Sequence, residues 1–114
     1  MENSYDATKA AAAKKVYSML GLSKKAGYAA GGEFMTEKSV KEKKSHLVII
    51  AGDSSDNTKK KFTDMCTYYK TPCYIFGDKD SLGHAMGYEL RASVSLNNKG
   101  MADQLISLLE KADM

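Results

Sequence analysis

The feature of this chain that most constrains its fold is Leu47-Val48-Ile49-Ile50-Ala51, a continuous apolar run near its middle. The run is rich in β-branched residues and has polar residues on both sides. A strand covered on one face alternates between apolar and polar residues, whereas this run shows no such alternation. It is therefore typical of a β-strand that is buried on both faces.

Helical and extended patterns alternate along the rest of the chain. Helices are expected over residues 7–26, 32–44, from the caps at 53–56 to Tyr69, 81–86 and 99–111, and strands over residues 28–31, 73–76 and 92–96. This order predicts the α/β class, as a three-layer α/β/α sandwich with a four-stranded mixed sheet. Residues 1–6 are expected to form a flexible N-terminal tail, and residues 7–114 a single domain.

Three local patterns refine this prediction. The third helix carries Phe62, Met65, Cys66 and Tyr69 at helical spacing, which predicts a single buried stripe. Asp80 or Ser81 is expected to cap the short fourth helix. Residues 92–96 alternate between small or polar and apolar side chains, which predicts a strand covered on one face only.

The distribution of charge says more than the net charge of +3. From Lys9 to Lys44 there are nine lysines against three glutamates, a local charge of +6, and the rest of the chain carries −3. A basic half on an otherwise near-neutral chain is typical of a protein that binds a polyanion. The alternative is a lysine-rich surface that is merely solvated.

The sequence offers little support for catalysis, metal binding or membrane insertion. Cys66 and Cys73, like His46 and His84, lack the spacing of a disulfide framework or a metal site. Cys66 lies in the apolar stripe of the third helix, where a packed thiol is expected rather than a nucleophile. No phosphate-binding glycine motif occurs, and no apolar run approaches the roughly 20 residues of a membrane span. We therefore expect no enzymatic activity, cofactor, small-molecule substrate or membrane partner.

The first residues show no secretory signal, so a cytoplasmic location is expected.

The basic second helix gives the clearest indication of function in the sequence. Gly31-Gly32 stands at the turn into this helix, where free backbone N–H groups can face a phosphate. Lys38 follows within the helix, and Lys24-Lys25 precede Gly27 at the end of the first helix. If these ends meet in space, the cations gather at one edge and suit phosphate neutralisation.

Several short segments together point to a known family. They are Leu20-Gly21-Leu22-Ser23-Lys24-Lys25-Ala26-Gly27, Gly31-Gly32-Glu33, Leu47 to Ser55, Asn57-Thr58-Lys59-Lys60-Lys61, Cys66 to Pro72, and Leu82-Gly83-His84-Ala85-Met86-Gly87-Tyr88-Glu89. In this order and spacing the chain resembles the ribosomal protein superfamily that binds kink-turn RNA, of the large-subunit seven-Ae type. The resemblance runs from about Val16 to Leu109 and is strongest to the small bacterial YlxQ-like branch.

The resemblance implies the same sandwich fold and a non-catalytic role in binding RNA. In that family, RNA docks on the start of the second helix, which carries the motif Gly-x-Asn-Glu-x-x-Lys. The glycine of this motif falls on Gly32 and its lysine on Lys38. A loop after the fourth helix closes on a flipped-out nucleotide, and it falls on Glu89-Leu90-Arg91-Ala92, with Leu90 as the packing residue.

One departure from the family motif concerns Phe34 and Met35, which stand where the family has its Asn-Glu pair. Either side chain could stack on a base, and we expect at least one of them to pack in the core instead. The expected RNA-binding residues are Lys24, Lys25, Gly31, Gly32, Glu33, Phe34, Met35, Lys38, Glu89, Leu90, Arg91 and Ala92.

The expected partner is a structured RNA, kink-turn-like or ribosomal, bound by a monomer that associates with the ribosome. The alternative is a protein-interaction module that keeps this fold but has lost specific RNA recognition. Phe34 and Met35, if exposed, would then form an apolar spot for a protein partner. A small hydrolase or transferase is a third hypothesis, and no group of residues in the sequence supports it.

Overall fold

The structure, a computed structural model, describes residues 4–113 of the chain. Its elements are α1 (Ser4–Lys25), β1 (Ala29–Gly31), α2 (Glu33–Lys41), β2 (Leu47–Ile50), α3 (Asp56–Tyr69), β3 (Cys73–Ile75), α4 (Lys79–Ala85), β4 (Ser93–Leu96) and α5 (Lys99–Asp113). The expected tail falls partly on residues 1–3, which lie outside the described residues, and helix α1 already begins at Ser4.

The four strands form one sheet in the order β1-β4-β2-β3. Strand β4 is antiparallel to both of its neighbours, whereas β2 and β3 are parallel. The predicted four-stranded mixed sheet is therefore confirmed. The expected central strand, β2, is buried along its whole length, as its unbroken apolar sequence predicts.

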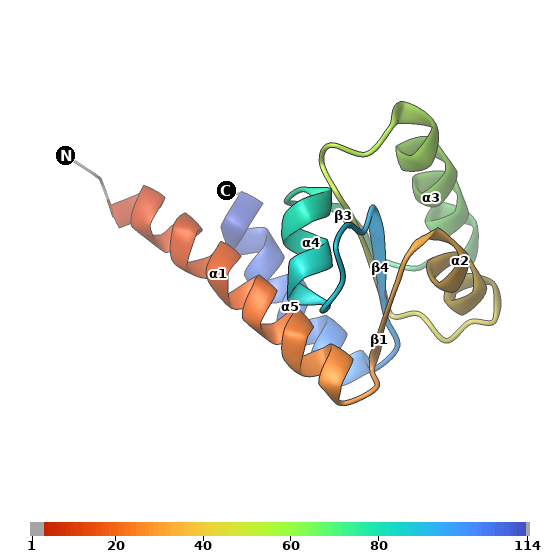
Figure 1. Cartoon of the computed structure of the whole chain (residues 1–114), viewed down its shortest axis with the longest axis horizontal. Helices are drawn as coiled ribbons and strands as arrows, with labels where there is room; N and C mark the ends of the chain where they lie inside the picture. The colour runs from red at the N-terminus through yellow and green to blue at the C-terminus, as the bar shows by residue number, and fades with distance from the viewer. Residues whose placement is uncertain (1–3, 114) are drawn as a thin grey trace.

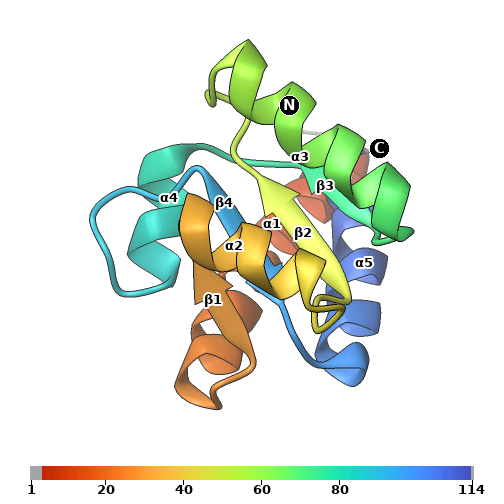
Figure 2. The same cartoon turned by 90° about the vertical axis from the view of Figure 1, so that its right-hand side faces the viewer.

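Helices cover both faces of the sheet. Helices α1, α4 and α5 lie on one side, and α2 and α3 lie on the other (Figures 1 and 2). Successive residues of β2 point to opposite sides, so Leu47 and Ile49 join one core and Val48 and Ile50 join the other. Phe62 and Cys66 of α3 pack against this second core, which confirms their place on the buried stripe.

The prediction that the last strand is covered on one face only is wrong. All four residues of β4 are buried, including Ser93 and Ser95. The serine hydroxyls face the α2 side, where Ser93 Oγ lies 3.2 Å from the hydroxyl of Thr36. Ser95 Oγ lies 2.8 Å from Ser45 Oγ and 2.7 Å from Asn97 Oδ1. Buried hydroxyls are tolerated here because each has a hydrogen-bond partner.

Two element boundaries also differ from the prediction. Helix α2 ends at Lys41, three residues early, and Lys43 then adopts a left-handed backbone with φ of 61°. Helix α4 is capped by Asp78, whose carboxylate accepts the backbone N–H of Ser81 at 2.7 Å, and not by Asp80 or Ser81. Within the part of the chain that the structure covers, no helix is both long and apolar enough to cross a membrane.

The buried hydroxyl contacts of β4 lead to a prediction about folding stability. Ser95→Ala removes the hydrogen bond to Asn97 and leaves Ser45 with one partner fewer, so we expect the free energy of unfolding to fall by about 1–3 kcal/mol. Ser107→Ala, at an exposed serine of α5, is the matched control and should change it by less than about 0.5 kcal/mol. Urea unfolding followed by circular dichroism measures both, and equal effects of the two substitutions would contradict the prediction.

Candidate nucleic-acid interface

The sheet brings the turn before α2 next to the loop between α4 and β4. Gly31 of β1 lies opposite Val94 of β4, and the N–H of Gly32 donates to the carbonyl of Ser93 at 2.9 Å. The residues that follow Gly32 and those that precede Ser93 therefore leave the sheet at the same edge. Two segments that the family resemblance assigns to RNA binding are neighbours in the structure.

The glycines of this turn leave room for an arginine side chain. Gly32 caps α2 with φ of 101° and ψ of 159°, a conformation essentially restricted to glycine. A Cβ atom on Gly31 would lie only 3.4 Å from Arg91 Cδ and from Met86 Cε. On Gly32 it would lie 3.7 Å from Arg91 Nε. The Arg91 side chain therefore lies directly against the turn.

Arg91 is held in place from several directions. Its backbone N–H donates to the carbonyl of Lys79 at 3.0 Å, which ties the loop to the start of α4. Its Nη1 donates to the carbonyl of Leu90 at 2.7 Å. Its Nε is buried and has no hydrogen-bond partner. A buried donor without an acceptor is rare in folded proteins, so this nitrogen marks a place where an acceptor is expected.

Tyr88 links Arg91 to the end of α1. The guanidinium carbon of Arg91 lies 3.8 Å from the centroid of the Tyr88 ring, and Lys24 Nζ lies 5.3 Å from the same centroid. A hydrogen bond from Lys24, together with its charge and the nearby Arg91, lowers the pKa of Tyr88. We call Lys24, Tyr88 and Arg91 the Tyr88 cluster. Lys25, the next residue of α1, is exposed.

Tyr88 is not among the RNA-binding residues expected from the sequence. It belongs only to one of the segments that resemble the family. The available signal was an aromatic residue directly after Gly87 and three positions before the single arginine of the chain.

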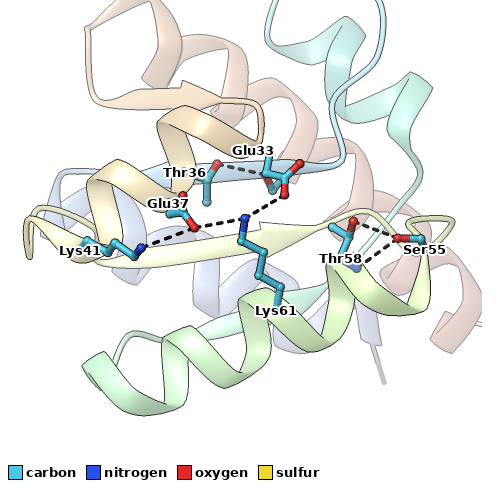
Figure 3. A network of polar contacts seen from close by, with 8 residues as sticks. Glu33, Thr36, Glu37, Lys41, Ser55, Thr58 and Lys61 are labelled. Atoms are coloured by element: carbon cyan, nitrogen blue, oxygen red, sulfur yellow. Dashed lines mark hydrogen bonds and ion pairs between the residues drawn. The ribbon is translucent and has the colours of Figure 1, made fainter.

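The outward residues of α2 lie on two faces of the helix. Glu33 and Glu37 face α3, where their carboxylates lie 2.9 Å and 3.1 Å from Lys61 Nζ (Figure 3). The hydrogen bond with Lys61 lowers the pKa of Glu37. The pair therefore contributes to folding stability at neutral pH, and this contribution disappears as acid protonates the Glu37 carboxylate. The Glu33 carboxylate is therefore engaged within the protein.

The other outward face of α2 carries Phe34, Met35 and Lys38. Thr36, Ser39 and Val40 form the buried face, which leaves these three side chains exposed. Phe34 is 73% exposed and Met35 is 43% exposed. The expectation that at least one of them packs in the core is wrong, because the helix turns both away from the sheet.

The loop Glu89–Ala92 presents one apolar side chain and is tightly backed by α4. Leu90 is 54% exposed. Ala92 is half-buried, and its carbonyl accepts hydrogen bonds from Ala51 N–H at 2.9 Å and from Ser54 Oγ at 3.3 Å. A Cβ atom on Gly83 would lie 2.6 Å from the carbonyl oxygen of Glu89, so only glycine lets the loop approach the helix this closely.

The residues considered for catalysis do not come together. Cys66 is buried on α3, whereas His84 is exposed on α4, on the other side of the sheet. The hydrogen bond with the Cys73 thiol, together with burial, raises the pKa of Cys66, which opposes a nucleophilic role. Among the described residues, no group of three or more His, Cys, Asp or Glu side chains is placed to hold a metal ion.

A hollow of about 400 Å³ between α1 and α4 contains titratable side chains, including Tyr17, Asp80 and His84. Burial raises the pKa of Tyr17, so its phenol stays protonated. The Ser81 hydroxyl lies 3.2 Å from the Asp78 carboxylate that caps α4. Helix capping therefore accounts for Ser81, and the geometry here gives no nucleophile paired with a base.

Comparison with known proteins identifies the family. The model of the ribosomal protein L7Ae/L30e/S12e/Gadd45 family matches residues 14–106. The chain belongs to this family. An RNA-binding protein named YlxQ from Bacillus subtilis (strain 168) is 37% identical over 94 residues, which are 82% of this chain and 94% of that protein. The RNA-binding protein YlxQ of Enterococcus faecium is 30% identical over 97 residues, covering 85% and 93%.

Solved structures agree with this membership of the L7Ae/L30e/S12e/Gadd45 family. A protein of unknown function from Bacillus halodurans C superposes with a TM-score of 0.81 at 32% identity, covering 84% of this chain and 97% of that one. The 15.5kD RNA binding protein of Giardia lamblia superposes with a TM-score of 0.73 at 19% identity, covering 90% and 88%. At that identity the second likeness shows the fold alone. The predicted sandwich and the family resemblance are both confirmed.

The close approach of Gly83 to the loop gives a second prediction. Gly83→Ala places a methyl group against backbone atoms of Glu89 and Leu90, so the loop must move away, at a cost of about 1–3 kcal/mol in stability. The Arg91 N–H, which bonds to Lys79, should then exchange faster in hydrogen-exchange measurements. Gly100→Ala, in the first turn of α5 with no close backbone neighbour, is the control and should leave that exchange unchanged. Unaltered Arg91 exchange in Gly83→Ala would show that the contact does not hold the loop.

Proposed function

We propose that this protein is a non-catalytic RNA-binding protein whose interface is formed by residues 31–38 and the loop Glu89–Ala92. The observation that carries the proposal is the Arg91 guanidinium, which lies against the glycine turn and stacks on the Tyr88 ring without an ion pair to any carboxylate of the described residues. Phosphate oxygens are the acceptors that arginine binds best in nucleic acids. Two bacterial relatives that share most of their length with this chain are named RNA-binding proteins, and neither name denotes an enzyme.

The charges around the turn support this assignment. In the part of the chain that the structure describes, Lys24, Lys38 and Arg91 take part in no ion pair, whereas Lys41 and Lys61 are paired with glutamates. Unpaired cations keep their full charge for a polyanion and release counterions when it binds. Lys25 adds an exposed charge at the end of α1. Glu33, whose carboxylate is paired with Lys61, contributes its backbone N–H at the start of α2.

A structured RNA with unstacked bases, such as a kink-turn, fits the apolar groups of this surface. Leu90 and Phe34 are exposed from the two neighbouring segments and can contact bases that leave the helical stack. We further propose that the protein acts as a monomer in the cytoplasm and meets its RNA on the ribosome. A gel-shift of the purified chain against a kink-turn RNA and a duplex of equal length, at two salt concentrations, tests the proposal. Retention of the kink-turn RNA alone supports it, and retention of neither RNA overturns it.

Lys38 should contribute to this binding through its charge. Lys38→Ala removes one cation from the outward face of α2, so we expect RNA affinity to fall about three- to tenfold and the salt dependence of binding to flatten. Lys111→Ala makes the same change of charge near the end of α5 and is the matched control. Fluorescence anisotropy across a salt series measures both. Equal effects of the two substitutions would remove Lys38 from the interface.

A second candidate function is a protein-interaction module, and the exposure of Phe34 and Met35 favours it. Phe34→Ala separates the two functions. If Phe34 stacks on a base, the substitution should weaken RNA binding by roughly 1–3 kcal/mol, about 5- to 150-fold. Thermal stability should hardly change, because the side chain is 73% exposed. Unchanged RNA affinity would instead assign this apolar spot to a protein partner.

A further inference from the structure

The Tyr88 cluster connects the end of α1 to the loop of the proposed interface that carries Arg91. Lys24 belongs to the last turn of α1, and Arg91 belongs to the loop between α4 and β4. Both cations lie over one tyrosine ring, at 5.3 Å and 3.8 Å from its centroid. A ring that attracts each cation through its π-electrons offsets part of their mutual repulsion. Tyr88 therefore brings together two positive charges that would otherwise move apart.

The two cations of the cluster are not neutralised within the protein. Neither Lys24 nor Arg91 forms an ion pair with a carboxylate of the described residues, although five other lysines do. Arg91 Nε has no hydrogen-bond acceptor at all, while Nη1 is bonded to the Leu90 carbonyl. The two positive charges of the cluster are therefore not paired with a carboxylate of the described residues, and Arg91 Nε lacks an acceptor.

Arg91 is the only arginine among the 17 basic residues of the chain. A planar guanidinium can stack on an aromatic ring and bond to phosphate at the same time, which an ammonium group does less well. At this position the guanidinium stacks on the Tyr88 ring, which suits arginine better than lysine. The glycine turn beside it leaves the guanidinium uncovered by any Cβ atom of residues 31 and 32.

We propose that Tyr88 is a positioning residue of the RNA interface, which holds Lys24 and Arg91 together as a two-cation site for the phosphate backbone. This inference rests on the proposed function, because it names the group of the RNA that the cluster binds. Tyr88 itself contributes no charge. Its effect on binding is exerted through the two cations, and this separates it from a residue that merely stacks on a base.

The salt dependence of RNA binding tests this role. Tyr88→Leu removes the ring without changing the charge, so any change in the salt slope must come from the cations that the ring positions. We expect affinity for the kink-turn RNA to fall about three- to tenfold and the slope of log K against log salt to decrease by about 1–2. Tyr88→Phe keeps the ring but loses the hydrogen bond from Lys24, so both values should lie between those of the wild type and Tyr88→Leu.

A control substitution and the binding of the wild type make the outcomes distinguishable. Tyr68→Leu, at a tyrosine of α3 that is 78% exposed, should change neither affinity nor slope. If the wild type fails to bind RNA, the proposed function is wrong. If the wild type binds and Tyr88→Leu keeps the full salt slope, the positioning role alone is wrong, even where affinity falls.

A measurement on the wild type keeps the inference testable if Tyr88→Leu does not fold. Because the chain has one arginine, its Nε–Hε resonance is unambiguous in a nitrogen-15 spectrum. Adding the kink-turn RNA should shift this resonance, since a phosphate bound to the guanidinium changes the electric field at Nε. An unshifted resonance at saturating RNA contradicts the proposal.

Discussion

The pairing of β1 with β4 is the interaction on which the candidate interface depends. Its backbone hydrogen bonds set Gly31 opposite Val94, and they extend to Gly32, which bonds to Ser93. A slip of one residue would turn every side chain of the strand to the opposite face. The sheet therefore places the backbone next to Arg91 beside the glycine turn. The contacts of Arg91 with Lys79 and Tyr88 then hold its side chain there.

Much of the fold could be predicted because apolar periodicity reports directly on burial. The unbroken run of β2 and the stripe of α3 were sufficient to place both elements. The fully buried β4 could not be predicted in the same way. Its serines look like solvent-facing residues in a linear sequence, and they are satisfied by Thr36 and Ser45, which only the folded chain brings near. Likewise, Asp78, Asp80 and Ser81 are all residue types that cap helices, and the structure shows that Asp78 is the cap of α4.

The candidate site also has parts that could be predicted from the sequence and parts that could not. The segments at 31–38 and 89–92 could be named in advance from their resemblance to a family, since that resemblance rests on local motifs. Tyr88 could not, because its significance lies in contact with Lys24, which is remote in sequence. The exposure of Phe34 and Met35 could have been inferred from Thr36, Ser39 and Val40, whose helical spacing marks the inward face. The apolar character of the pair predicts burial instead, and the structure shows both side chains exposed.

The hydroxyl contacts beneath α2 have a consequence for the roles of the two sides of this helix. This helix meets β4 partly through directional bonds between Thr36 and Ser93, rather than through interlocking apolar side chains alone. Its inward face therefore specifies orientation, and the exposed side chains of Phe34, Met35 and Lys38 take no part in the packing against the sheet. A substitution at these exposed positions leaves the packing of the helix on the sheet intact. Ligand preference and folding stability therefore depend on different faces of α2.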